Sequence, residues 1–286
     1  MKQVKYFLQF LSIIILFGIF KLIGLKFSSI ISSKIFQILG PIFRSNKILD
    51  YNLSVAFPKL DNPKKFKIKK KMWENYGKIF AEYMFIKDFK NKKLSEKIRI
   101  ENQNILEEIK KDLKPVIFIS GHFNNFELMA MCIENSGVQL STIYRPLNNK
   151  FLNPLMEKIR KTYICKNQIK KGFAGTRELL NHFKKGNSIA LMIDQRVSEG
   201  INCQFFGKEA LTTTIPAQFV KKFNSKIIPV YIERDEKDFF NLKINKPIEF
   251  SKVESVKTIT LKLNKILEDM IIKNPEQWIW THNRWK

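Results

Sequence analysis

The sequence is short of cysteine, glycine and acidic residues, and each shortage excludes a class of protein. Cys132, Cys165 and Cys203 are an odd number, and they form neither a C-x-x-C pair nor a metal-ligand spacing with a histidine. A disulfide framework and a structural zinc site are therefore not expected, and a reducing compartment is favoured. With 11 glycines among 286 residues and 44% hydrophobic residues, collagen-like and low-complexity classes are excluded as well.

The shortage of acidic residues leaves a large positive charge. The chain has 51 Lys+Arg against 26 Asp+Glu, which gives a formal charge of +25. Only eight of the basic residues are arginine, so the excess is mostly lysine, and part of it is open to explanation by genomic lysine bias. The charge predicts an anionic partner, which is a nucleic acid, an anionic membrane surface, or an acidic protein or substrate. The apolar content is too high for a disordered polycation.

One long hydrophobic run is present, at the N-terminus. Residues 6–20 carry no charge, lie between Lys5 and Lys21, and extend through Leu25 to about the 20 residues that a spanning helix needs. No small-x-small cleavage site follows, so residues 1–26 are predicted to be an uncleaved anchor, either transmembrane or interfacial. A cleaved signal peptide and a buried core helix are the rival interpretations. Residues 22–43 suit a helix along the lipid headgroups. The basic residues downstream place the main domain on the cytoplasmic side.

The rest of the chain divides into two regions by pattern. Residues 27–114 read as a membrane-proximal helical region, in which Asn62-Pro63 opens a strongly basic amphipathic helix. In residues 115–286 short buried strands alternate with helices. This alternation predicts an α/β core, with helices around a central mixed and largely parallel sheet whose later strands close it in antiparallel fashion. Residues 27–286 are expected to form one globular unit.

The first strand of this core ends in a segment that carries chemistry. Residues 119–127 read ISGHFNNFE, in which Gly121 permits a tight turn, His122 follows the strand end, and Glu127 falls in the first turns of a helix. Ligands collect at such strand ends in α/β folds. We expect Glu127 to accept a hydrogen bond from one imidazole nitrogen while the other removes a proton. Because no G-x-S-x-G or cysteine nucleophile adjoins His122, the attacking group of an acyl transfer is expected to be the substrate's own hydroxyl.

Charged residues at other strand ends are expected to share this edge. Arg145 follows the second strand, Asp194 and Gln195 end a third, and Arg160 lies on a helix between them. These residues provide cations to hold a phosphate or stabilise an oxyanion, and a carboxylate to position an arginine. His182 and His282 are read as structural, and no metal is expected.

Several further blocks accompany this segment in a fixed order along nearly the whole chain. They are Asn52-Leu53 with Ala56-Phe57-Pro58, His122 to Leu128, Tyr144-Arg145-Pro146 with Asn148-Asn149, the stretch before SIALMIDQ, Phe205-Phe206-Gly207 with Thr212 to Thr214, and Pro275 to Arg284. As a set, with GHFNNFEL as an H-x4-E block, they resemble the bacterial lipid A biosynthesis (lauroyl/myristoyl) acyltransferases, within the lysophospholipid acyltransferase superfamily.

The resemblance implies an inner-membrane enzyme that transfers an acyl chain from an acyl carrier protein thioester to a hydroxyl of a lipid A precursor. It implies that His122 and Glu127 form the catalytic dyad, and it matches Arg160 and Asp194 to further positions important for activity. No cofactor is expected. A nucleic-acid partner is not expected either, because the chain lacks a recognisable nucleic-acid module and its charge is spread along the sequence. Two alternatives stay open at this point. One is acylation of another glycolipid or phospholipid, and the other is a basic, non-catalytic protein that binds membrane or nucleic acid.

Overall fold

The central sheet of the protein has seven strands in the order β1-β9-β8-β2-β5-β3-β4. The structure is a computed structural model that describes residues 2–91 and 93–286. The strands are β1 (Ile98–Glu101), β2 (Ile117–Ser120), β3 (Leu140–Tyr144), β4 (Asn167–Lys170), β5 (Ser188–Met192), β8 (Ile227–Arg234) and β9 (Phe240–Ile244). Every neighbouring pair is parallel except β8 and β9. The expected α/β class and mixed, largely parallel sheet are thus confirmed.

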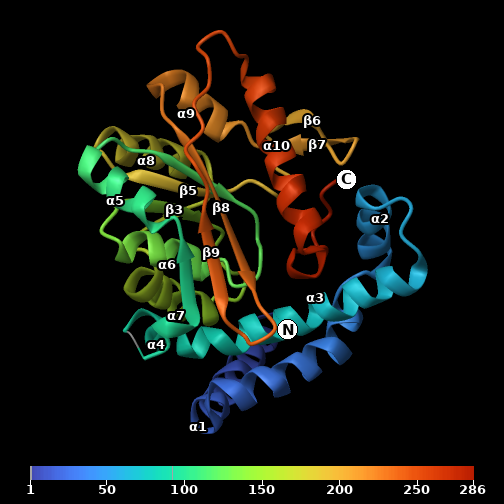
Figure 1. The fold of residues 1–286 in the computed structure, drawn as a ribbon. Coiled ribbons are helices and arrows are strands. Elements are labelled where there is room, and N and C mark those ends of the chain that lie inside the picture. Colours follow the sequence, from blue (N-terminus) through green and yellow to red (C-terminus); the bar gives the residue numbers. More distant parts are fainter. Residues whose placement is uncertain (1, 92) are drawn as a thin grey trace.

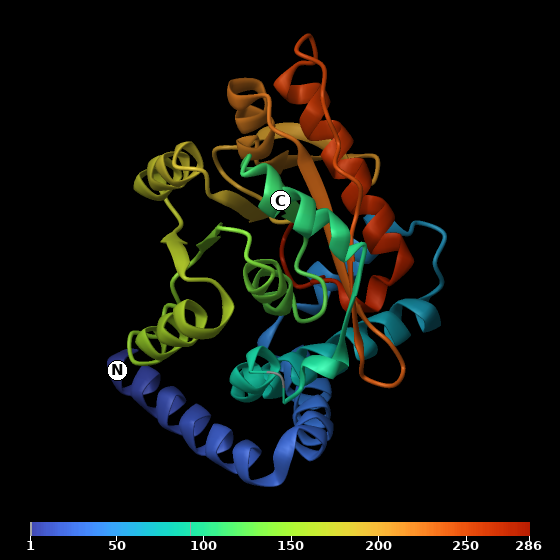
Figure 2. The same cartoon turned by 60° about the vertical axis from the view of Figure 1, so that its left-hand side comes forward.

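Helices cover both faces of this sheet, with α6 and α7 on one side of β8 and α10 on the other (Figures 1 and 2). Beyond α1, they are α2 (Asn46–Ala56), α3 (Asn62–Glu82), α4 (Ile86–Lys90), α5 (Gln103–Asp112), α6 (Glu127–Asn135), α7 (Leu152–Ile159), α8 (Phe173–Lys184), α9 (Ile215–Phe223) and α10 (Val256–Lys273). Short helical turns are η1 (Tyr83–Phe85), η2 (Ser95–Lys97), the π-helical η3 (Arg160–Ile164) and η4 (Pro275–Gln277).

The predicted start of α3 is confirmed, because the Asp61 side chain accepts a hydrogen bond from the backbone N–H of Lys64 and a proline occupies the first turn. Strands β1 and β4 and a separate hairpin of β6 (Ile201–Phe205) and β7 (Lys208–Thr212) were not expected from the sequence. Each is four or five residues long and more than half of its positions are at least partly exposed, so no continuous apolar run marks it.

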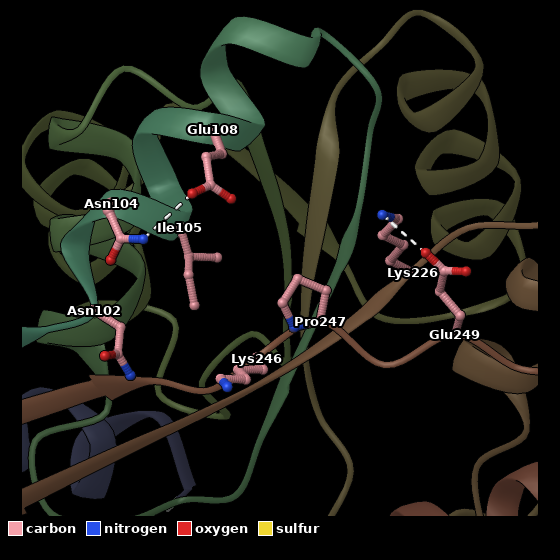
Figure 3. A pocket seen from close by; sticks show the side chains of 8 residues that line it. All are labelled: Asn102, Asn104, Ile105, Glu108, Lys226, Lys246, Pro247 and Glu249. Atoms are coloured by element: carbon pink, nitrogen blue, oxygen red, sulfur yellow. Dashed lines mark hydrogen bonds and ion pairs between the residues drawn. The ribbon is translucent and has the colours of Figure 1, made fainter.

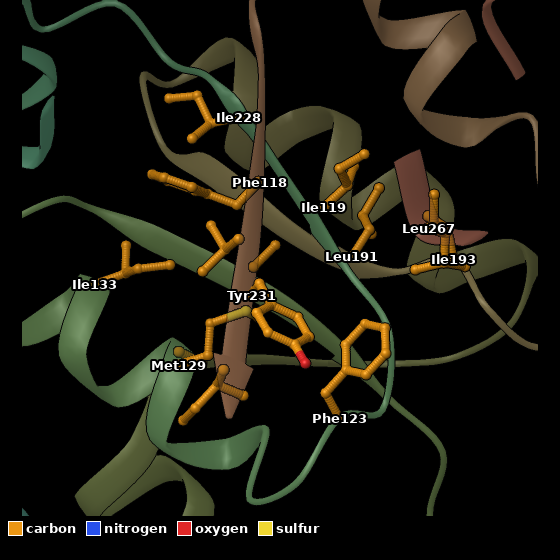
Figure 4. Close-up of a cluster of buried hydrophobic side chains, with 14 of the residues drawn as sticks. Phe118, Ile119, Phe123, Met129, Ile133, Leu191, Ile193, Ile228, Tyr231 and Leu267 are labelled. Atoms are coloured by element: carbon orange, nitrogen blue, oxygen red, sulfur yellow. The ribbon is translucent and has the colours of Figure 1, made fainter. Parts of the chain in front are cut away.

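The hydrophobic core fixes the strand ends at which the site lies. Strand β2 is buried at all four positions, as expected for a parallel strand covered on both faces. Its side chains pack with those of β5 and β8, with Met129 and Ile133 of α6, and with Leu267 of α10 (Figure 4). This core joins the two helical layers through the sheet, so the loops that leave β2 and β5 start from rigid positions.

Helix α1 (Lys2–Phe43) consists of two arms that meet at Gly24. Gly24 has φ 78° and ψ 167°, a conformation that favours glycine and breaks the helix. We call residues 2–23 the first arm and residues 25–43 the second arm. The second arm packs along α3, whereas the first arm runs back along the protein, with its N-terminal end beside the start of α7 (Figure 2). There Nδ2 of Asn149 donates a hydrogen bond to the Tyr6 carbonyl at 2.8 Å. Among the residues that the structure describes, α1 is the one helix long and apolar enough to cross a membrane, by length and composition.

Candidate active site

The site is built where the adjacent parallel strands β2 and β5 end. Ser120 of β2 pairs in register with Met192 of β5, so His122 and Asp194, each two residues further on, leave the sheet side by side. Gly121 permits this close approach, because a Cβ there would lie 3.2 Å from Oδ2 of Asp194 and 2.9 Å from the Phe123 ring. The sequence prediction that His122 and Asp194 share one edge of the sheet therefore agrees with the structure.

Asp194 holds His122 from two directions. Its Oδ1 lies 2.7 Å from Nδ1 of the imidazole, and its Oδ2 accepts hydrogen bonds from the His122 backbone N–H at 2.7 Å and from Nε1–H of Trp278 at 2.8 Å. The Asp194 side chain is completely buried, whereas His122 keeps 21% of its side chain exposed. The carboxylate therefore fixes the tautomer with a proton on Nδ1 and leaves Nε2 as the basic nitrogen.

The pair perturbs the protonation of both groups. Burial alone disfavours the imidazolium, but the charge and hydrogen bond of Asp194 outweigh burial, so the pKa of His122 is raised above 6.5. Burial also opposes ionisation of Asp194, yet the charge and hydrogen bonds of His122, with the indole of Trp278, lower the pKa of its carboxyl. Asp194 is therefore a carboxylate at neutral pH and stabilises a proton on the imidazole.

Glu127 occupies a second cluster instead of contacting the imidazole. It begins α6, and its Oε1 accepts hydrogen bonds from the Tyr83 hydroxyl and, at 2.8 Å, from Nε of Arg160. Nη2 of Arg160 lies 2.7 Å from the same oxygen and donates to the Tyr83 hydroxyl at 3.1 Å. The side chains of Glu127 and Arg160 are 7% and 16% exposed. This cluster is a partly buried ion pair with a phenol bridging its two charges.

Two expected contacts are therefore corrected. Asp194, and not Glu127, receives the hydrogen bond from the imidazole, and Glu127, and not Asp194, positions Arg160. The reason is topological, because β2 and β5 are neighbours in the sheet, whereas η1 and η3 bring Tyr83 and Arg160 to the start of α6. Both clusters still lie within electrostatic range of each other, since Glu127 raises and Arg160 lowers the pKa of His122.

The pKa values of the second cluster keep it in one charge state. Burial raises the pKa of Tyr83 well above 10, and the neighbouring carboxylate of Glu127 adds to this shift. Burial alone lowers the pKa of Arg160, but Glu127 and Tyr83 outweigh it and raise the pKa further. Tyr83 is therefore a neutral hydroxyl and Arg160 a cation at neutral pH.

The other two predicted site residues lie at the same strand edge. Arg145 directly follows β3 and is exposed, and Gln195 follows Asp194 and is half-buried. Arg160, rather than Arg145, is the arginine that the structure places on Glu127.

A third charged cluster holds the backbone between His122 and Glu127. Nη1 of Arg234 lies 2.6 Å from Oε1 of Glu82, with these side chains only 7% and 2% exposed. Nη2 of Arg234 donates to Oδ1 of Asn124 at 3.1 Å, and Nδ2 of Asn125 donates to Oε2 of Glu82 at 2.9 Å. Asn124 has φ 43°, so this network stabilises a strained turn in which both asparagines are buried.

The C-terminal segment, residues 275–286, packs against Asp194 and the residues that follow it. Trp278 contacts Asp194, and Nε2 of His282 accepts a hydrogen bond from the backbone N–H of Arg196 at 3.0 Å. Nδ2 of Asn52 donates to the carbonyl oxygens of Trp280 and His282 at 2.8 Å. Burial lowers the pKa of His282, which favours the neutral form that this contact requires. His182 donates to or accepts from Ser141 at 3.0 Å, in keeping with a structural role.

Sequence reasoning missed Tyr83, Glu82, Arg234 and Trp278 as members of the site. Trp278 and Asn52 lie in blocks that carried the family resemblance, so those blocks were an available signal. Glu82 and Tyr83 end a basic amphipathic helix with no motif around them. Their role depends on where α3 lies, which only the tertiary structure provides.

Two cavities of very different size lie at opposite ends of the strands of the sheet. A narrow cavity of about 50 Å³ adjoins His122 and is lined by Tyr76, Ile79 and Phe126 among others. An open groove of about 620 Å³ lies at the opposite end, where β8 begins (Figure 3). Polar side chains of the groove pair with one another, as Lys226 does with Glu249 at 2.9 Å and Asn104 with Glu108 at 3.3 Å. The chemistry therefore belongs to the small cavity.

Residues that would hold a metal are not grouped in the described part of the chain, where no three His, Cys, Asp or Glu side chains converge. The three cysteines are buried, and burial raises the pKa of Cys132 and of Cys165 to about 12. These thiols are thus protonated and unreactive at neutral pH.

A partly exposed imidazole on a buried carboxylate, with a fixed cation nearby at the ends of parallel strands, is an arrangement suited to an acyltransferase. Residues 1–286 match the family described as bacterial lipid A biosynthesis acyltransferase, and the chain belongs to this family. Membership decides against the alternative of a non-catalytic binding protein.

Curated relatives resemble the chain at low identity over most of its length. A lipid A biosynthesis acyltransferase of Haemophilus influenzae is 23% identical over 82% of this chain and 75% of the relative. A lipid A biosynthesis lauroyltransferase and a palmitoleoyltransferase of Escherichia coli are 19% and 21% identical, each over 85% of this chain and 79% of the relative.

Proposed function

We propose that the protein transfers a fatty acyl chain from an acyl carrier protein thioester to a hydroxyl group of a lipid A precursor, in lipopolysaccharide biosynthesis. The observation that carries this proposal is the His122–Asp194 pair, a partly exposed imidazole whose tautomer is fixed by a buried carboxylate. Such a pair removes a proton from a hydroxyl, which is the step that an acyl transfer to an alcohol needs. The names of the curated relatives supply the class of acceptor.

The reaction then runs in one direct transfer. Nε2 of His122 takes the hydroxyl proton as the acceptor oxygen attacks the thioester carbonyl, and the imidazolium is stabilised by Asp194. The tetrahedral intermediate collapses by breaking its C–S bond. The leaving thiolate takes the proton back from His122, so the base is regenerated and no covalent acyl-enzyme forms.

Arg160 and Glu127 act in this proposal as a fixed cation and its holder. The guanidinium is locked by Glu127 and Tyr83 close enough to His122 to influence its pKa. A cation held in this way stabilises a developing oxyanion or binds an acceptor phosphate without reorganising during the reaction. Arg145 and Gln195, at the same strand edge, would contact the substrate as it enters.

The charge of the protein suits both proposed substrates. An acyl carrier protein is acidic, and a lipid A precursor is a phosphorylated glycolipid in the membrane. The +25 charge favours the approach of an anionic carrier, and the basic first turns of α3, residues 64–71, provide a surface for anionic headgroups. In this proposal α1 anchors the enzyme in the inner membrane and the catalytic core faces the cytoplasm.

Mass spectrometry of lipid A and total glycolipids tests the proposal. Cells with and without the gene should differ by one acyl chain on lipid A, and a gene carrying His122→Ala should fail to restore it. Membranes containing this variant should lose acyl transfer from acyl carrier protein thioesters by about 10³-fold or more. Unchanged lipid A together with a mass shift in another glycolipid would show that this other glycolipid is the acceptor. Normal activity of a well-expressed His122→Ala variant would overturn the mechanism.

A further inference from the structure

The second arm of α1 packs on α3 with its small and polar residues. Ser28, Ser32, Ser33 and Gly40 are the buried residues of this arm. The contact is close, because a Cβ on Gly77 of α3 would lie 2.4 Å from the Ser32 carbonyl oxygen. Helices approach each other so closely when small residues line their interface, which is the usual packing inside membranes.

Most large apolar residues of the same arm face away from the protein. Phe36 is an exception, because the centroid of its ring lies 5.4 Å from that of Phe80 in α3. The residues with 44% to 72% of their surface exposed along one face are Phe27, Ile30, Ile31, Ile38 and Ile42. A helix of a water-soluble protein has the opposite arrangement, with its large apolar side chains in the core. The inverted arrangement therefore predicts an apolar environment outside the arm.

The charges around this face identify the environment. The first 49 residues contain seven basic residues and no acidic residue. Lys26 and Lys34 are exposed on the second arm, and Arg44 and Lys47 follow its end. Lysine side chains extend from an apolar surface toward phosphate groups, and clusters of them bind anionic lipid. A second copy of this chain would present the same positive charge and would be repelled.

We propose that the outward face of the second arm is a lipid-binding surface that lies in an anionic phospholipid bilayer, continuous with the first arm. The first arm exposes the same kind of side chains, including Phe7, Leu11 and Ile15. The break at Gly24 prevents the two arms from forming one straight transmembrane rod. The protein therefore contacts the membrane along the length of the second arm as well as along the first.

Contact of the second arm with the membrane brings the bilayer next to α3, the helix that leads to the site. Helix α3 lies directly against the second arm. The same helix ends at Glu82 and continues into Tyr83, which contacts Glu127 in the site. A lipid substrate would then reach His122 without leaving the membrane surface. The surface itself is argued from packing and charge and does not depend on the proposed acyl transfer.

Site-specific fluorescence in vesicles tests the proposal. Ile30→Cys and Ile38→Cys variants of the full chain, labelled with an environment-sensitive dye, are placed in vesicles of phosphatidylethanolamine and phosphatidylglycerol. The native cysteines are buried, so they should label poorly. A Val253→Cys variant is the matched control, because Val253 is 91% exposed in the loop between β9 and α10, at the far end of the molecule from α1 (Figure 1).

We expect lipids with a nitroxide on the acyl chain to quench labels 30 and 38 at least two-fold, and aqueous iodide to quench only label 253. Quenching of labels 30 and 38 by iodide to the same extent as label 253 would overturn the proposal. Protection from both quenchers would also overturn it and would indicate that protein covers the face. An Ile42→Cys variant repeats the measurement if one of the first two fails to fold. Since no step reads acyl transfer, failure here is distinct from failure of the proposed function.

Discussion

Two carboxylates flank the strand-end segment, and their partners differ. Asp194 is completely buried beside a histidine, an indole and a backbone N–H, whereas Glu127 contacts an arginine and a phenol. The partner that titrates near neutral pH is bound to Asp194 alone. Tyr83 and Arg160, the partners of Glu127, do not change charge near neutral pH. The carboxylate within the H-x4-E block thus holds a cation, while the carboxylate that contacts the imidazole comes from a different strand.

The largest effect is expected from removing the charge of Asp194. In Asp194→Asn the buried imidazole loses its stabilising carboxylate, and acyl transfer should fall on the order of 10³-fold. The neutral His122 is the active form, so activity should rise with pH through a pKa above 6.5 in the wild type. In the variant the charge of Asp194 no longer opposes the effect of burial, so the pKa of His122 should fall and the rise in activity should move to lower pH. The pH dependence of kcat/KM measures both effects.

Glu127→Gln is the control for this prediction. It removes a carboxylate of similar burial that does not contact the imidazole. The pH at which kcat/KM rises should shift less in Glu127→Gln than in Asp194→Asn. The reverse order would show that Glu127, and not Asp194, assists the base, and the comparison of the two carboxylates would fail.

The next largest effect is expected on stability. Arg160→Met leaves Glu127 partly buried without its cation, which should lower the free energy of unfolding by about 3 kcal/mol. The double variant Arg160→Met with Glu127→Gln should recover at least half of this loss, because no unpaired charge remains. Urea unfolding in detergent measures both values. Equal losses in the single and double variants would show that the pair carries no coupling.

A smaller effect is expected from the phenol. Tyr83→Phe removes the hydroxyl that bridges Glu127 and Arg160 but leaves the ion pair between them, so kcat should fall by about three- to ten-fold, as for the loss of about 1 kcal/mol from one hydrogen bond. The pH limb assigned to His122 should hardly change. A shift of that limb as large as in Asp194→Asn would place Tyr83 on the imidazole side of the comparison.

The smallest effect is expected from an exposed cation that lies outside both pairs. Arg145→Ala should raise KM for an acyl carrier protein thioester no more than about three-fold, because exposed charges contribute less than about 1 kcal/mol. This increase should disappear at high salt, whereas the defects of Asp194→Asn and Arg160→Met should persist. A large, salt-independent loss of kcat would assign Arg145 to the chemistry.

The sequence predicted the parts of the site that local patterns encode. Short buried runs placed β2, β3, β5 and β8, and hence His122, Arg145 and Asp194 at strand ends. The choice of carboxylate for His122 was not predictable, because it depends on β5 lying beside β2 in the sheet order. A spacing of five residues between His122 and Glu127 favoured the wrong contact, since sequence proximity is easier to read than strand adjacency.

Residues that arrive from distant helices were beyond prediction for a related reason. Glu82 and Tyr83 end α3, and the sequence marks that helix only as basic and amphipathic. Their meeting with Arg234 and Arg160 closes loops of many residues, and no local pattern specifies such contacts. The edge strands β1 and β4 were missed because they are short and only half-buried.

The contact between Trp278 and Asp194 sets an order of events during biosynthesis. Helix α1 is synthesised well before the strands of the sheet, because it precedes all of them in the chain. The indole that completes the hydrogen bonds of Asp194 is synthesised 84 residues after that carboxylate, and Arg284, which donates from Nη1 to the Leu211 carbonyl at 2.8 Å, fixes the segment around it. The imidazole is thus fully supported only after this late segment has folded back onto the sheet, and a product truncated before Trp278 should be inactive.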